Sequence, residues 1–114
     1  MPNGPEYVEA ALERIEGASA ALGALENVDE GWKSEAQERL TSVAGLLQGT
    51  TDRFFLKTRV CLPFARKCDE AAQALDALLA QPGTPQELSA ALEALEKTAR
   101  TLDERSLMQG MAIT

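Results

Sequence analysis

The chain has 114 residues, a net charge of −7 and 45% hydrophobic residues. This length is typical of one domain that buries its own core without a metal or a disulfide framework, and the hydrophobic content is too high for a disordered chain. The acidic charge argues against general binding of nucleic acid, because most of the surface would repel a phosphate backbone. With two cysteines and no histidine, neither a metal site nor a cofactor is predicted.

The N-terminal sequence MPNGPEYVEA lacks the positive region and the apolar run of a secretory signal. Apolar runs elsewhere are only a few residues long, so no segment is expected to span a membrane. We therefore expect a cytoplasmic protein.

Two amphipathic helices are predicted in the first half of the chain. The first begins at Pro5, since proline is favoured in the first turn of a helix, and its apolar residues recur in steps of three and four. A loop at 26–31 separates it from a second helix, which begins near Trp32 and is capped at its end by Gly49. The two apolar stripes are Val8, Ala11, Ile15, Ala18, Leu22 and Leu25, and then Trp32, Ala36, Leu40, Val43 and Leu47.

A third helix is predicted over 51–80, with Thr50, Thr51 or Asp52 as its N-terminal cap. It is expected to end at QPGTP, residues 81–85, where proline and glycine interrupt helical structure. Its apolar stripe comprises Cys61, Phe64, Cys68, Ala71, Leu75 and Leu78.

A fourth helix is predicted to begin at Pro85, with Thr84 as its N-terminal cap. The sequence Thr84-Pro85-Gln86-Glu87 has the form of a capping box, with a proline in the first turn. The periodic pattern fades after about Arg105, and residues 106–114 are predicted to be a flexible tail. The apolar stripe of this helix comprises Leu88, Ala91, Leu92, Leu95, Ala99 and Leu102.

Four amphipathic helices joined by short connections predict an all-α antiparallel four-helix bundle, up-down-up-down, in a single domain over 1–114. The stripes are rich in alanine and make a thin core. An alternative is therefore that two copies complete the core by forming a homodimer. The residues favour neither the monomer nor the dimer.

Residues 53–67 differ from the rest of the chain. They hold five basic residues and no acid, whereas the remaining chain has 6 basic and 18 acidic residues and a charge of −12. In a straight helix over 51–80, Lys57 would fall within the apolar stripe, where an ammonium group is costly. Because Pro63 disfavours helical geometry at this point, we expect a kinked third helix, or a break near 59–63, that turns Lys57 outward.

This segment has two main interpretations. In the first, its aromatic residues plug one end of the bundle and its cations neutralise the acidic helices. In the second, it is a contact patch for a protein partner with an acidic or apolar surface, as in a small acidic adaptor, anti-activator, immunity or chaperone-like protein. A third interpretation is that the same cations contact an anion or nucleic acid. The predicted patch comprises Arg53, Phe54, Phe55, Leu56, Lys57, Arg59, Arg66 and Lys67.

No catalytic residue is predicted, because the chain has no histidine to act as a general base near neutral pH. Phosphate-binding glycine loops and serine-elbow motifs are also missing from the sequence. On a continuous helix Cys61 and Cys68 would lie about 10.5 Å apart, too far for a disulfide, so two buried thiols are the simplest interpretation. The alternative function is a thiol- or ligand-responsive regulator, in which these cysteines form a redox switch around Pro63.

Overall fold

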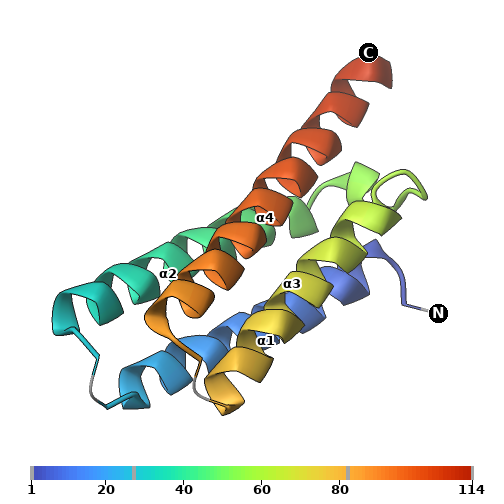
Figure 1. The fold of residues 1–114 in the computed structure, drawn as a ribbon. Coiled ribbons are helices and arrows are strands. Elements are labelled where there is room, and N and C mark those ends of the chain that lie inside the picture. The colour runs from blue at the N-terminus through green and yellow to red at the C-terminus, as the bar shows by residue number, and fades with distance from the viewer. Residues whose placement is uncertain (1, 27, 82, 114) are drawn as a thin grey trace.

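A computed structural model of the chain describes the backbone of residues 2–26, 28–81 and 83–113, and the side chains of these residues except 55 and 108–113. Residues 27 and 82, in the two predicted loops, lie outside the described part. Within it the chain forms four α-helices and no strand, which confirms the predicted all-α four-helix bundle (Figure 1). The helices are α1 (Gly4–Ala24), α2 (Glu30–Thr51), α3 (Leu62–Ala80) and α4 (Pro85–Ile113).

Consecutive helices run in opposite directions, but they do not follow chain order around the bundle (Figure 1). α1 packs against α2 and α3, and α4 packs against the same two helices. α1 and α4 are therefore diagonal to each other, as are α2 and α3. As a result, the connection from α2 to α3 crosses one end of the bundle, while the other two connections lie together at the opposite end.

The starts of α1 and α4 are held by capping boxes. Asn3 Oδ1 accepts a hydrogen bond of 2.9 Å from the backbone N–H of Glu6, and the Glu6 carboxylate accepts one from the Asn3 N–H. At α4, Thr84 Oγ1 accepts from the Glu87 N–H at 3.1 Å, and Glu87 Oε1 accepts from the Thr84 N–H at 3.4 Å. Each box satisfies backbone donors that have no partner within the helix, and the second confirms the predicted start of the fourth helix.

The end of α2 differs from the sequence prediction. Gly49 is not a cap, since the helix continues through Thr50 and its C-cap residue is Asp52. Thr50 is buried, and its Oγ1 donates to the Leu47 carbonyl oxygen at 2.7 Å. Its hydroxyl group therefore binds within α2. The predictions of Gly49 as the cap that ends the second helix, and of Thr50, Thr51 or Asp52 as the cap that starts the third, were both wrong.

The predicted third helix is broken and not kinked. After α2 the chain forms a short 3₁₀ helix, η1 (Phe54–Lys57), and α3 begins only at Leu62. Pro63 lies in the first turn of α3, where its missing N–H costs nothing because first-turn donors have no partner within the helix. The break expected near 59–63 is confirmed, and Lys57 is exposed as the break requires.

The core extends along all four helices, and the stripes of α1, α2 and α4 are largely as predicted. The buried face of α3 is only partly the predicted one. Cys61, Cys68 and Leu75 are buried as predicted. Phe64, Ala71 and Leu78 are only half-buried, and Ala65 and Ala72 are buried in addition. α3 packs most extensively against α1, and alanines on both helices permit this close approach.

α4 is the longest helix, with 29 residues, and its C-terminal part projects past the other helices (Figure 1). The helical backbone includes 106–113, although the sequence pattern fades near Arg105. Ser106 is still buried and Leu107 is partly exposed. The predicted flexibility of 106–114 stays a prediction, and Thr114 lies outside the described residues.

Candidate protein-interaction surface

The connection between α2 and α3, residues 52–61, closes one end of the bundle. η1 packs against α1, α3 and α4, and the Leu56 side chain is fully buried in the core. The backbone also approaches α1 closely, because a Cβ atom on Gly4 would lie 2.2 Å from the Leu56 carbonyl oxygen. Leu56, predicted to belong to the contact patch, is therefore a core residue. The Phe55 side chain lies outside the described part of the structure.

Arg53 attaches this connection to α4. Its Nη1 donates to the Asp103 carbonyl oxygen at 3.0 Å, to Asp103 Oδ1 at 2.8 Å and to Ser106 Oγ at 2.7 Å. Both members of the Arg53–Asp103 ion pair are largely buried. Arg53, also predicted for the patch, therefore binds within the molecule.

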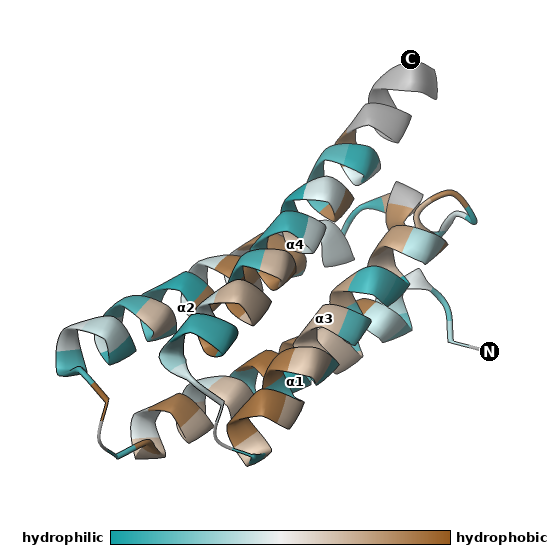
Figure 2. Cartoon of the chain, viewed as in Figure 1, coloured by the Kyte–Doolittle hydropathy of each residue, from teal (hydrophilic) through white to brown (hydrophobic). Residues whose placement is uncertain are grey.

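Large exposed apolar side chains gather at the same end. Among residues with described side chains they are Phe54, 71% exposed, Val60, 53% exposed, and Leu107, 49% exposed. Phe54 lies in η1, Val60 lies in the turn before α3, and Leu107 follows the Arg53 contact Ser106 along α4. Figure 2 shows apolar residues along the connection that bears the first two. Grouped exposed apolar residues are characteristic of interaction sites.

The remaining predicted cations lie in two places. Lys57 and Arg59 are exposed on the connection itself. Arg66 and Lys67 are exposed on α3, where Arg66 Nε lies 3.6 Å from Glu70 Oε1. The positive charge beside the exposed apolar groups therefore comes mainly from the connection. We define the end surface as Phe54, Lys57, Arg59, Val60 and Leu107.

The predicted patch left out two members of the end surface, Val60 and Leu107. Neither follows a periodic pattern, because Val60 lies in a turn and Leu107 lies where the pattern of α4 has faded. A further cation was also missed at this end: the Arg105 guanidinium lies 5.2 Å from the centroid of the Phe64 ring. No sequence pattern identifies Leu107 or Arg105, because it is the fold that brings this part of α4 to the connection.

Cys61 and Cys68 are both buried thiols that form no disulfide. Burial raises the pKa of Cys61, although a hydrogen bond with Thr58 acts in the opposite direction. Burial likewise raises the pKa of Cys68 to about 11, against the lowering effect of its hydrogen bond with Thr98. Because the thiolate is the reactive form, neither thiol is activated for redox chemistry in this conformation.

Within the residues that the structure describes, no group of three or more acidic or cysteine side chains is placed to hold a metal ion. The helices of that part are also too short or too polar to cross a membrane, as predicted. Comparisons of the chain with known protein families, curated proteins and solved structures find no match.

Proposed function

We propose that this chain is a non-enzymatic protein-binding module that contacts its partner through the end surface. One observation carries the proposal: the large exposed apolar side chains of the described residues lie at one end of the bundle, and two of them share a short connection with Lys57 and Arg59. Exposed apolar area is unfavourable in water by about 25 cal/mol per Å², so covering the exposed part of Phe54 with another protein would be favourable.

The chemistry of the surface indicates the kind of partner. An aromatic side chain such as that of Phe54 supplies a large part of the binding energy of an interface. Lys57 and Arg59 would attract an acidic partner and orient it during encounter. The rest of the chain carries −12 and would repel the same partner. We therefore propose a partner surface with an apolar pocket and an acidic rim.

Modules of this kind include adaptors, anti-activators, immunity proteins and chaperone-like proteins, and we place this one in the cytoplasm. The two buried thiols support that location, because cysteines remain reduced there. The alternative of a redox switch at Cys61 and Cys68 has no supporting observation, since both thiols are buried and have raised pKa values.

The test is capture of a partner from cells that express the chain naturally. Phe54→Asp and Leu107→Asp each place a carboxylate on the end surface. Ala90→Asp makes a similar change at an exposed position of α4 towards the opposite end. We expect both end variants to lose the partner and the control to retain it, with helical circular dichroism unchanged in all three. Equal capture by the end variants and the control would rule out the end surface.

The role of charge is tested separately with Lys57→Glu combined with Arg59→Glu. We expect weaker capture of the partner by this variant, and weaker binding by the wild type as salt rises, because exposed charges are screened. The matched control is Lys97→Glu, a charge reversal at an exposed position of α4. A shift of labelled nucleic acid at about 50 mM salt would instead favour the nucleic-acid interpretation.

A further inference from the structure

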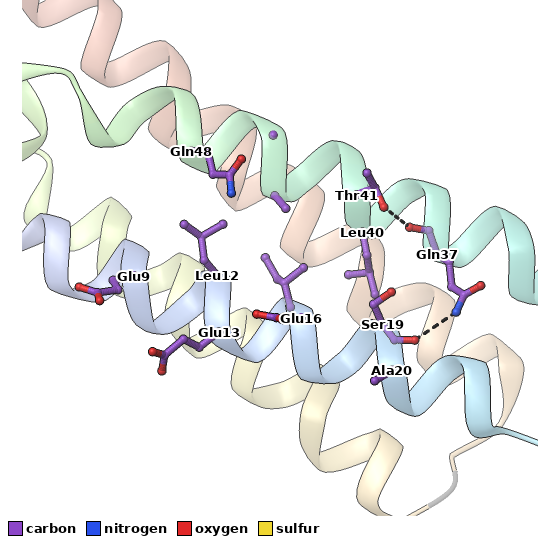
Figure 3. Close-up of a pocket in the computed structure, with 13 residues that line it drawn as sticks. Glu9, Leu12, Glu13, Glu16, Ser19, Ala20, Gln37, Leu40, Thr41 and Gln48 are labelled. Atoms are coloured by element: carbon purple, nitrogen blue, oxygen red, sulfur yellow. Dashed lines mark hydrogen bonds between the residues drawn. The ribbon is translucent and has the colours of Figure 1, made fainter.

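A groove of about 930 Å³ runs between α1 and α2 (Figure 3). Its floor is apolar, and Leu12 points into the space between the two helices. Gln37 bridges the helices, since its Nε2 donates to the Ser19 carbonyl oxygen at 3.1 Å. The apolar floor comprises Leu12, Ile15, Leu40 and Ala44.

The α1 rim of the groove is acidic. Glu9, Glu13 and Glu16 line it and are exposed. Their spacing of four and then three residues places them along one side of the helix over about 10 Å. Among the described residues none of the three forms a salt bridge, and no lysine or arginine lines the groove. The groove therefore presents three carboxylates without a counter-charge.

The cations of α1 and α2 have partners outside the groove. Arg14 Nε donates to Asp69 Oδ1 of α3 at 2.9 Å. Arg39 forms a two-point ion pair with Glu96 of α4, in which Nε donates to Oε2 at 3.1 Å and Nη2 donates to Oε1. Lys33, near the start of α2, donates to the carbonyl oxygen of Leu25 at 2.7 Å. These contacts leave the acidic rim uncompensated.

The α2 side of the groove is built from small or uncharged residues. Thr41, Ala44, Gly45 and Gln48 follow one another along it. A Cβ atom on Gly45 would meet nothing within 4 Å, so the space above this backbone is open. Small residues allow another helix to approach closely.

We propose that this groove binds one helix of a partner protein, with an apolar stripe and a basic flank. The stripe would cover the apolar floor, as in other complexes in which an amphipathic helix lies in a groove. Residues 9–20 of α1 span about 16 Å, the length of three helical turns. Lysine or arginine residues at three- and four-residue spacing would meet the acidic rim. This site is opposite in charge to the end surface and does not depend on it.

The probe is a labelled synthetic peptide of about 18 residues, or five helical turns, with a leucine stripe and flanking lysines. A second peptide carries glutamate in place of every lysine. Binding is measured by fluorescence anisotropy at low and high salt. We expect the lysine peptide to bind, with affinity falling as salt screens the carboxylates, and the glutamate peptide not to bind.

Two glycine variants provide matched controls. Gly45→Leu fills the groove, whereas Gly17→Leu makes the same change on α1 at a position that does not line the groove. Both sites have open space for a side chain, and leucine favours helix over glycine, so both variants are expected to fold. We expect Gly45→Leu to lower the affinity for the lysine peptide about tenfold or more, a loss of about 1.4 kcal/mol of binding free energy. Gly17→Leu should leave that affinity unchanged.

A triple variant, Glu9→Gln with Glu13→Gln and Glu16→Gln, is expected to lose the salt-dependent part of the binding. Phe54→Asp is expected to bind the peptide as the wild type does, which separates this site from the end surface. The proposal is overturned if the lysine peptide fails to bind at about 100 μM, an affinity near the weak end of specific recognition. It is also overturned if Gly45→Leu binds equally well, or if Gly45→Leu converts a dimeric wild type to a monomer, because a second copy then occupies the groove.

Discussion

Gly4 and Leu56 bring the start of α1 and the α2–α3 connection into contact at the crossed end of the bundle. A Cβ atom on Gly4 would lie 2.2 Å from the Leu56 carbonyl oxygen and 3.3 Å from its carbonyl carbon. Backbone atoms cannot move aside as the end of a flexible side chain can. The connection therefore has this position only because residue 4 lacks a side chain.

Gly4→Ala is expected to lower the free energy of unfolding by about 1–3 kcal/mol, the usual cost of forcing extra atoms into a packed site. Gly17→Ala is the control, since its Cβ would meet nothing within 4 Å. It should raise the free energy of unfolding by about 0.5–1 kcal/mol, because alanine favours helix over glycine. Urea denaturation of both variants measures the difference, and a Gly4→Ala protein as stable as the wild type would disprove the contact.

Leu56 and Phe54, two residues apart in η1, are expected to respond differently to truncation. Leu56→Ala should lower the free energy of unfolding by about 2–5 kcal/mol, because it leaves a cavity in the core. Phe54→Ala should change it by no more than about 0.5 kcal/mol, since Phe54 is mostly exposed. Equal losses in a denaturation experiment would mean that both side chains belong to the core.

Much of the fold follows from local patterns in the sequence. The stripe from Val8 to Leu22 and the capping box at Thr84 are local signals, and both predictions agree with the structure. The order of the helices around the bundle is not local, because it depends on which faces pack together. For α3 the pattern allowed two neighbouring apolar faces, and the one with Ala65 and Ala72 is buried.

The candidate surface was less predictable than the fold. Lys57 could be placed outside the core because a charge cannot remain in an apolar stripe. Leu56 and Phe54 could not be separated, since a turn without helical periodicity gives no indication of which side chain faces inward. Leu107 lies at this end because α4 extends past the α2–α3 connection (Figure 1). A short stretch of sequence does not indicate how the two segments pack.

Cys61 and Cys68 are expected to react slowly with a thiol reagent in the native protein and quickly in denaturant. Their raised pKa values also have a consequence for stability. Because the folded state favours the neutral thiol, the stabilising effect is complete below the unfolded pKa of about 8.5. It is lost as pH rises towards 11, the approximate pKa of Cys68 in the folded protein. Rapid native labelling at neutral pH would contradict this prediction.

The ion pair between Arg39 and Glu96 is expected to weaken in acid. The hydrogen bond from Arg39 lowers the pKa of Glu96, against the opposing effect of burial. The pair therefore adds to the free energy of unfolding above the usual glutamate pKa of about 4.3. This contribution is lost as pH falls through the lower pKa that Glu96 has in the folded protein. Partial exposure limits it to about 1 kcal/mol.

Comparison of the wild type with Glu96→Gln checks this expectation. The difference in free energy of unfolding should be largest near neutral pH and should shrink below about pH 4. Urea denaturation across this range measures it. A difference that stays constant with pH would show that the charge of Glu96 does not contribute to folding.

Photo-crosslinking in living cells tests most directly whether the end of the bundle crossed by the α2–α3 connection binds a partner. Benzoylphenylalanine in place of Phe54 should give one discrete crosslinked product, and the same probe in place of Ala90 should not. Combining the probe at residue 54 with Lys57→Glu and Arg59→Glu should greatly reduce that product. The same products from both positions, or none from residue 54, would contradict the proposed surface.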